Sequence, residues 1–142
     1  MTATAVPGAE LERLDDVLDG TDAAIYAYGL VAARLNSEGA ARALDAMAVH
    51  RTHRGVLRAR ILALGVTPRA AAPAYTPPFE VEDSVTATRL AALVEDRLAG
   101  QWAALAAAST IQPRLDAALT AQECATRSVT WSGKAPVWNG AT

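Results

Sequence analysis

The sequence predicts an all-α protein built as a bundle of four helices. The composition favours helices, because 51% of the 142 residues are hydrophobic but only 5% are aromatic, and alanine supplies much of the apolar content. Four stretches also repeat apolar residues in alternating steps of three and four, which is the spacing of an amphipathic helix. A chain of this length can bury roughly two-thirds of its unfolded surface in one domain, so we expect a single domain over residues 1–142.

The first two predicted helices form a hairpin. Between residues 11 and 35 the inward positions are Leu11, Leu14, Leu18, Thr21, Ile25, Tyr28, Ala32 and Leu35. Between residues 43 and 64 they are Ala43, Met47, His50, Arg54, Leu57, Ile61 and Leu64. The connection at 36–39 is short, which makes the two helices antiparallel neighbours. The first helix is mainly acidic and the second mainly basic, so flanking ion pairs are expected to select this pairing.

The segment 65–82 is expected to be a long loop. It begins at Gly65, which ends the second helix, and it contains four prolines, each of which disfavours helix at the preceding residue: Pro68, Pro73, Pro77 and Pro78. In extended form the segment spans about 55 Å, more than the roughly 40 Å of a helix of about 26 residues. This length favours a Pro-rich crossover between the second and third helices over a simple up-down-up-down arrangement.

The third helix is expected to begin at Asp83 or Ser84, which are good capping residues, and to end near residue 109. The fourth follows a tight turn near Thr110 and tolerates Pro113 in its first turn. Its predicted inward positions are Leu115, Ala118, Leu119, Gln122, Ala125 and Val129. An N-terminal arm (1–9) and a C-terminal tail (133–142) flank the bundle. Trp138 in the tail is a large apolar side chain that we expect to dock on this bundle or on a second copy.

Charge and cysteine content exclude several classes of function. The net charge of -2 and the pI of about 5.6 argue against binding to nucleic acid or to an anionic membrane surface. The sequence shows no signal peptide and no uninterrupted apolar run of about eighteen residues, so neither export nor membrane insertion is expected. The single cysteine, Cys124, can form neither an internal disulfide nor a thiolate metal site, which favours a cytoplasmic location.

Polar residues fall near the middle of each predicted helix and form a buried layer there, consisting of Thr21, Asp22, His50, Arg54, Glu95, Gln122 and Glu123. Helix bundles place metal and cofactor sites at this height. A carboxylate-bridged dinuclear site requires Glu-x-x-His on two helices, and this motif occurs nowhere in the sequence: Leu98 follows Glu95 by three residues, and Thr126 follows Glu123. A single ion held by His50, Glu95 and Glu123 remains the alternative, since imidazole and carboxylate are suitable ligands.

The favoured interpretation of the polar layer is an ion network without metal. Arg54 lies on the predicted seam one turn from His50, so a permanent cation occupies the place where a metal ion would need anions. We expect the Arg54 guanidinium to pair with Asp22, Glu95 or Glu123. The sequence therefore predicts no bound cofactor.

Several segments resemble those of a known family. They are Asp22-Ala23-Ala24-Ile25-Tyr26-Ala27-Tyr28-Gly29, His50-Arg51, the loop from Ala72-Pro73-Ala74-Tyr75 to Pro78-Phe79, and Trp131. Together they resemble the alanine-rich actinobacterial ferritin-like family that is classed as a domain of unknown function. The resemblance implies a ferritin-like four-helix bundle over almost the whole chain. Members of that family typically carry Glu-His before the Ala-Ala pair, whereas this chain has Thr21-Asp22, so a metal-ligand pair is missing.

These observations predict a non-enzymatic structural or interaction protein with a degenerate metal site. Self-association into a dimer is expected from Trp131, Trp138 and the alanine-rich outer helix faces. The alternative is a metal-binding oxidoreductase or metal-handling protein for iron or manganese. A small-molecule carrier is a third class, and the sequence names no ligand for it.

Overall fold

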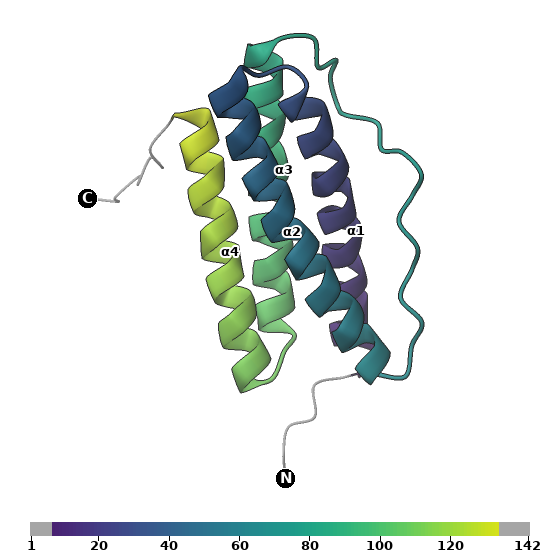
Figure 1. The fold of residues 1–142 in the computed structure, drawn as a ribbon. Coiled ribbons are helices and arrows are strands. Elements are labelled where there is room, and N and C mark those ends of the chain that lie inside the picture. The colour runs from purple at the N-terminus through teal and green to yellow at the C-terminus, as the bar shows by residue number, and fades with distance from the viewer. Residues whose placement is uncertain (1–6, 134–142) are drawn as a thin grey trace, which may run out of the picture.

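The structure, a computed structural model, describes residues 7–133. Four helices lie side by side in one bundle: α1 (Pro7–Ala32), α2 (Ser37–Ala63), α3 (Ser84–Ala107) and α4 (Ile111–Ser132) (Figure 1). No strand occurs within residues 7–133, so the prediction of an all-α bundle of four helices is confirmed. None of these helices combines the length and the apolar character needed to cross a membrane.

The helix ends follow local chemical signals. The Asn36 side chain accepts a hydrogen bond from the Gly39 amide at 2.8 Å and caps α2, while Asp83 and Thr86 form a capping box at the start of α3. Gly133 ends α4 in the left-handed conformation with φ +66°, which glycine adopts without steric cost. α1 begins at Pro7, inside the predicted arm 1–9, because proline suits the first turn of a helix.

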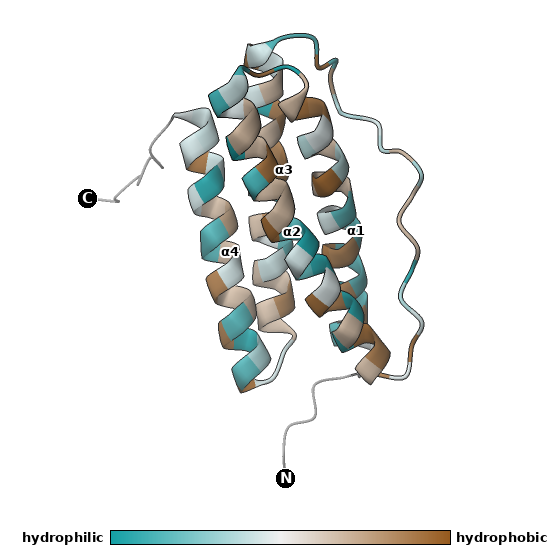
Figure 2. Cartoon of the chain, viewed as in Figure 1, coloured by the Kyte–Doolittle hydropathy of each residue, from teal (hydrophilic) through white to brown (hydrophobic). Residues whose placement is uncertain are grey.

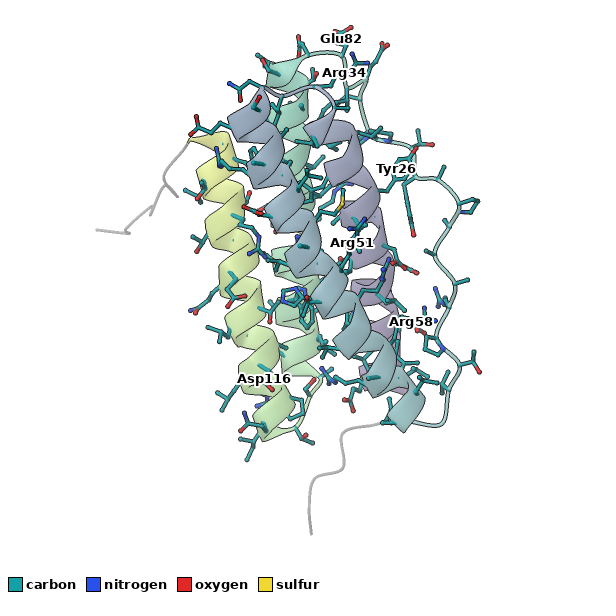
Figure 3. All side chains as sticks on the ribbon, in the orientation of Figure 1. Tyr26, Arg34, Arg51, Arg58, Glu82 and Asp116 are labelled. Atoms are coloured by element: carbon teal, nitrogen blue, oxygen red, sulfur yellow. The ribbon has the colours of Figure 1, made fainter. Side chains whose placement is uncertain are left out.

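The chain direction reverses between α1 and α2, and the segment 64–83 then runs along the outside of the bundle to its other end (Figure 1). As a result α3 runs in the same direction as α2, and α4 returns antiparallel to α3. The segment is attached to α1 at two places. Arg69 donates a hydrogen bond to Asp19 at 3.0 Å, and the Tyr75 ring packs on Tyr26, which points to this side of the bundle in Figure 3.

Three pairs of helices approach each other closely: α1 with α2, α1 with α3, and α3 with α4. The fourth side of the bundle, between α2 and α4, is wider. There a groove of about 250 Å³ is lined from α2 by Arg42, Ala46 and Val49, and from α4 by Arg127 and Trp131. The interior of the bundle is therefore least closely covered along this side.

Hydrophobic and hydrophilic residues alternate along every helix (Figure 2), and the buried apolar residues form two clusters. One cluster includes Leu14, Leu18, Leu57, Leu98, Trp102 and Leu105; the other includes Tyr28, Val31, Met47, Leu90 and Trp131. Thr21, Asp22, His50 and Glu95 are also buried, on the stretches of the helices between those two sets. Four of the seven predicted layer residues therefore lie inside the bundle.

The predicted inward face of α4 is wrong. Leu115 and Leu119 are 59% and 57% exposed, while Ala117, Cys124 and Trp131 are buried. The two faces have the same helical periodicity, so periodicity alone cannot choose between them. The face with small residues packs against α3, because alanine and cysteine allow two helices to approach closely.

Candidate functional site

Glu95 of α3 is the centre of the buried polar layer and is completely buried. Its Oε1 atom accepts three hydrogen bonds: from the Tyr28 hydroxyl at 2.7 Å, from His50 Nε2 at 2.7 Å and from Arg127 Nε at 3.0 Å. The three donors come from α1, α2 and α4. One carboxylate oxygen thus joins all four helices.

A second set of contacts holds the donors in place. Trp131 Nε1 donates to the Tyr28 hydroxyl oxygen at 3.0 Å, and Arg127 Nη2 lies 3.7 Å from Cys124 Sγ. The Arg42 guanidinium lies over the Trp131 ring at 4.3 Å, which adds a cation–π contact from α2. Trp131 is therefore engaged inside its own bundle.

The donors keep Glu95 ionised despite its burial. Burial by itself raises the pKa of Glu95, but the hydrogen bond and charge of His50, the charge of Arg127 and the hydrogen bond from Tyr28 outweigh it and lower the pKa below its ordinary value. Burial likewise opposes the charge of Arg127, but the nearby Glu95 carboxylate raises the pKa of that guanidinium overall. The two side chains therefore form an ion pair with no net charge.

Five rings follow one another through the layer, in the order Trp131, Tyr28, His50, His53 and Trp102, with successive centroids 6.1, 5.8, 5.9 and 5.6 Å apart. Trp131 belongs to one apolar cluster and Trp102 to the other. The chain of rings therefore connects both parts of the core through the polar layer.

Asp22 occupies a different part of the layer, and Arg54 is its nearest cation. Arg54 Nη1 lies 3.8 Å from Asp22 Oδ1, beyond hydrogen-bond distance, and the Arg54 side chain is 39% exposed. Burial raises the pKa of Asp22, although the charge of Arg54 counteracts part of this effect. Arg54 therefore forms an ion pair with Asp22, one of its three predicted partners. The prediction that Arg54 is the central cation of the network is wrong, because Arg127 contacts Glu95 instead.

Gln122 and Glu123 do not belong to the buried layer. Both are exposed on α4, because the side of the helix with the small residues faces α3, and these two residues lie on the solvent side. Arg127 was not identified from the sequence, although a signal exists. Ala117, Cys124 and Trp131 recur at intervals of seven, and Arg127 lies between the last two on the same side of the helix.

The site does not fit a metal centre. Glu95 Oε2 and His50 Nδ1 are buried without a hydrogen-bond partner, so they are the two atoms of the layer best able to bind a metal ion. Within residues 7–133, however, no group of three or more His, Cys, Asp or Glu side chains could hold a metal ion. The third predicted ligand, Glu123, is exposed, and the Arg127 guanidinium already neutralises Glu95.

The family described as "Domain of unknown function (DUF4439)" matches residues 14–140 of this chain. The chain is also similar to a solved protein, whose description is "Crystal structure of a conserved hypothetical protein, rv2844, from Mycobacterium tuberculosis". The two share 31% sequence identity with a TM-score of 0.85, over 89% of this chain and 96% of that one. No curated protein matches the chain.

Proposed function

The chain belongs to the DUF4439 family of domains of unknown function, and we propose that it is a ferritin-like bundle in which an ion network made by the protein replaces the metal site. Its role is structural or interactive rather than catalytic. The observation that carries this proposal is the placement of three donors, Tyr28, His50 and Arg127, on the single Oε1 atom of Glu95.

The course of the chain supports the ferritin-like part of the proposal. Ferritin-like folds have one long crossover connection, which makes the second and third helices parallel. Here α2 and α3 run in the same direction, and the segment 64–83 between them contains Pro68, Pro73, Pro77 and Pro78 (Figure 1). The polar layer lies at mid-height, where ferritin-like proteins carry their metal ligands.

Electrostatics support the absence of a metal function. The Arg127 guanidinium is a permanent cation 3.0 Å from the Glu95 carboxylate. Two like unit charges 4 Å apart repel by about 4 kcal/mol at an effective dielectric constant near 20, and a divalent ion doubles that repulsion. A metal ion bound to Glu95 would therefore have to displace Arg127 from a site already balanced in charge.

The outward face of α4 supports an interaction role. Ile111, Leu115 and Leu119 are all more than half exposed, and Ala118 and Gln122 beside them are exposed and uncharged. Isolated apolar residues are ordinary on a protein surface, but a continuous apolar face indicates a contact with another molecule. We assign to this face the expected self-association into a dimer, in a reducing cytoplasmic setting that suits the free thiol of Cys124.

Elemental analysis tests the proposal. Protein purified without chelators, and then incubated with Fe²⁺ or Mn²⁺ and desalted, is expected to retain far less than one metal ion per chain. Glu95→Gln and His50→Gln should retain no less metal than the natural sequence, with folding checked by circular dichroism. One iron or manganese per chain, lost in both variants, would establish the metal-handling alternative and overturn this proposal.

A further inference from the structure

A long groove lies on the outer side of α3. It consists of two adjoining cavities of about 540 and 450 Å³ that share Arg89 and Ala92. Trp131 and Ser132 at the end of α4 line the first cavity, and Phe79 of the segment 64–83 lines the second. The groove therefore follows α3, with the end of α4 on one side and the segment 64–83 on the other.

The groove offers apolar and aromatic surface to an incoming side chain. Val85 lines it and is 74% exposed, although it is a branched aliphatic residue. The Arg89 guanidinium lies over the Phe79 ring at 4.3 Å. This contact fixes the plane of the guanidinium at the point where the two cavities meet. A fixed guanidinium plane is a good stacking surface for an aromatic ring.

The described part of the chain ends at the rim of this groove. Ser132 lines the groove, and Gly133 follows it in the left-handed conformation that turns the chain away from the helix axis. Trp138 is five residues beyond Gly133, a reach of up to about 17 Å for an extended chain. The distance along α3 from Val85 to Ala92 is only about 10 Å, so Trp138 can reach the whole first cavity.

The composition of the segment suits the groove. Its central residues are Ala135, Pro136, Val137 and Trp138, and a proline favours an extended chain on the residue before it. The family match extends to residue 140, so the segment belongs to the matched domain and is not an addition to it. We propose that residues 134–140 dock into the α3 groove of their own chain, with Trp138 packed between Val85 and Arg89.

A double-mutant cycle tests this docking in the full chain. Val85→Asp and Trp138→Ala should each lower the thermal midpoint by roughly 3 to 5 °C, because each removes one side of the same contact. The double variant should lose clearly less than the sum. Val56→Asp is the matched control, since Val56 is also an exposed valine but lies on α2 and lines neither cavity; its effect should add to that of Trp138→Ala. Additive effects for Val85→Asp, or no effect of Trp138→Ala, would overturn the proposal.

A disulfide trap distinguishes docking in the same chain from docking in a second copy. A chain carrying both Val85→Cys and Val137→Cys should form an intramolecular disulfide on mild oxidation, with Cys124 remaining buried and unreacted. Two chains that each carry one of these substitutions should give no cross-linked dimer when mixed. Efficient cross-linking between the mixed chains would place the segment in the groove of a partner copy and contradict docking within the chain.

Discussion

Glu95 shows how a buried carboxylate can stay ionised through contacts with other side chains. Burial alone would favour its protonated form, but hydrogen bonds from His50 and Tyr28 and the charge of Arg127 favour the carboxylate. The arrangement is asymmetric, since the three donors meet at Oε1 while Oε2 has no hydrogen-bond partner. Arg127 is the permanent cation among the three donors, so its removal would leave the carboxylate without its ion-pair partner.

The first prediction compares two arginines. Arg127→Met should lower the free energy of unfolding by about 3 kcal/mol or more, because it leaves the Glu95 charge buried without its cation. Arg54→Met should cost less than about 1 kcal/mol, since Arg54 is partly exposed and does not hydrogen-bond Asp22. Urea unfolding at neutral pH measures both values. A larger loss for Arg54→Met than for Arg127→Met would restore Arg54 as the central cation.

The sequence identified part of the site and missed its cation for a definite reason. Thr21 and His50 occupy inward positions of clear apolar seams, so their burial followed from periodicity, whereas Asp22 and Glu95 lie beside the seams. Identifying Arg127 as the cation requires knowledge of how α4 is rotated about its axis. A long arginine side chain can also reach the surface from a position near a seam, as Arg54 does.

At the level of elements, α4 is the least predictable helix. It has two possible apolar faces, one with leucines and one with small residues around Cys124 and Trp131. The sequence of α4 alone favours the leucine face, because leucine is more often buried than alanine in a bundle. The structure buries the other face, since close packing on α3 and the hydrogen bond from Trp131 to Tyr28 require it.

The second prediction concerns the exposed face of α4. Leu115→Glu and Leu119→Glu should each change the stability of the isolated chain by less than about 0.5 kcal/mol, because both side chains are largely exposed. Together they should convert a dimer to a monomer, which light scattering detects as a halved mass. Ala117→Glu is the control on the buried face and should prevent folding.

Two results would contradict this assignment. A monomeric mass for the natural sequence at all concentrations would remove self-association. Unfolding of Leu115→Glu comparable to that of Ala117→Glu would mean that the leucine face is the buried one.

At the level of the whole molecule, the class of fold followed from the sequence much more securely than the site did. Helical periodicity, capping residues such as Asp83 and terminators such as Gly65 are local signals, and each marks an element independently of the others. The polar layer is a property of all four helices together. Its contacts join residues as far apart as Tyr28 and Trp131, and no local pattern specifies such pairs.

The third prediction is a loss of stability on mild acidification. Burial, followed by the charges of His50 and Arg127, lowers the pKa of His53, although Glu123 and Glu95 partly counteract this effect. In the unfolded chain this imidazole takes up a proton near its ordinary value of 6.5, whereas in the folded chain it stays neutral to lower pH. Stability should therefore fall as the pH drops below about 6.5.

Thermal midpoints measured from about pH 7.5 to 5.5 check this sign. The decline should be smaller in His53→Gln, which has no proton to take up. A midpoint that rises on acidification, or a decline that is the same in His53→Gln, would show that His53 is not responsible.

The most direct test of the whole account is a pH titration of the Glu95 side-chain carboxyl by ¹³C NMR, followed on the resonance of the folded state. The central claim is that Arg127, His50 and Tyr28 hold this buried group as a carboxylate. The account predicts a titration midpoint below the ordinary value of 4.5 for a glutamate. A midpoint above 4.5 would mean that burial dominates and that the ion pair with Arg127 does not hold the centre of the bundle.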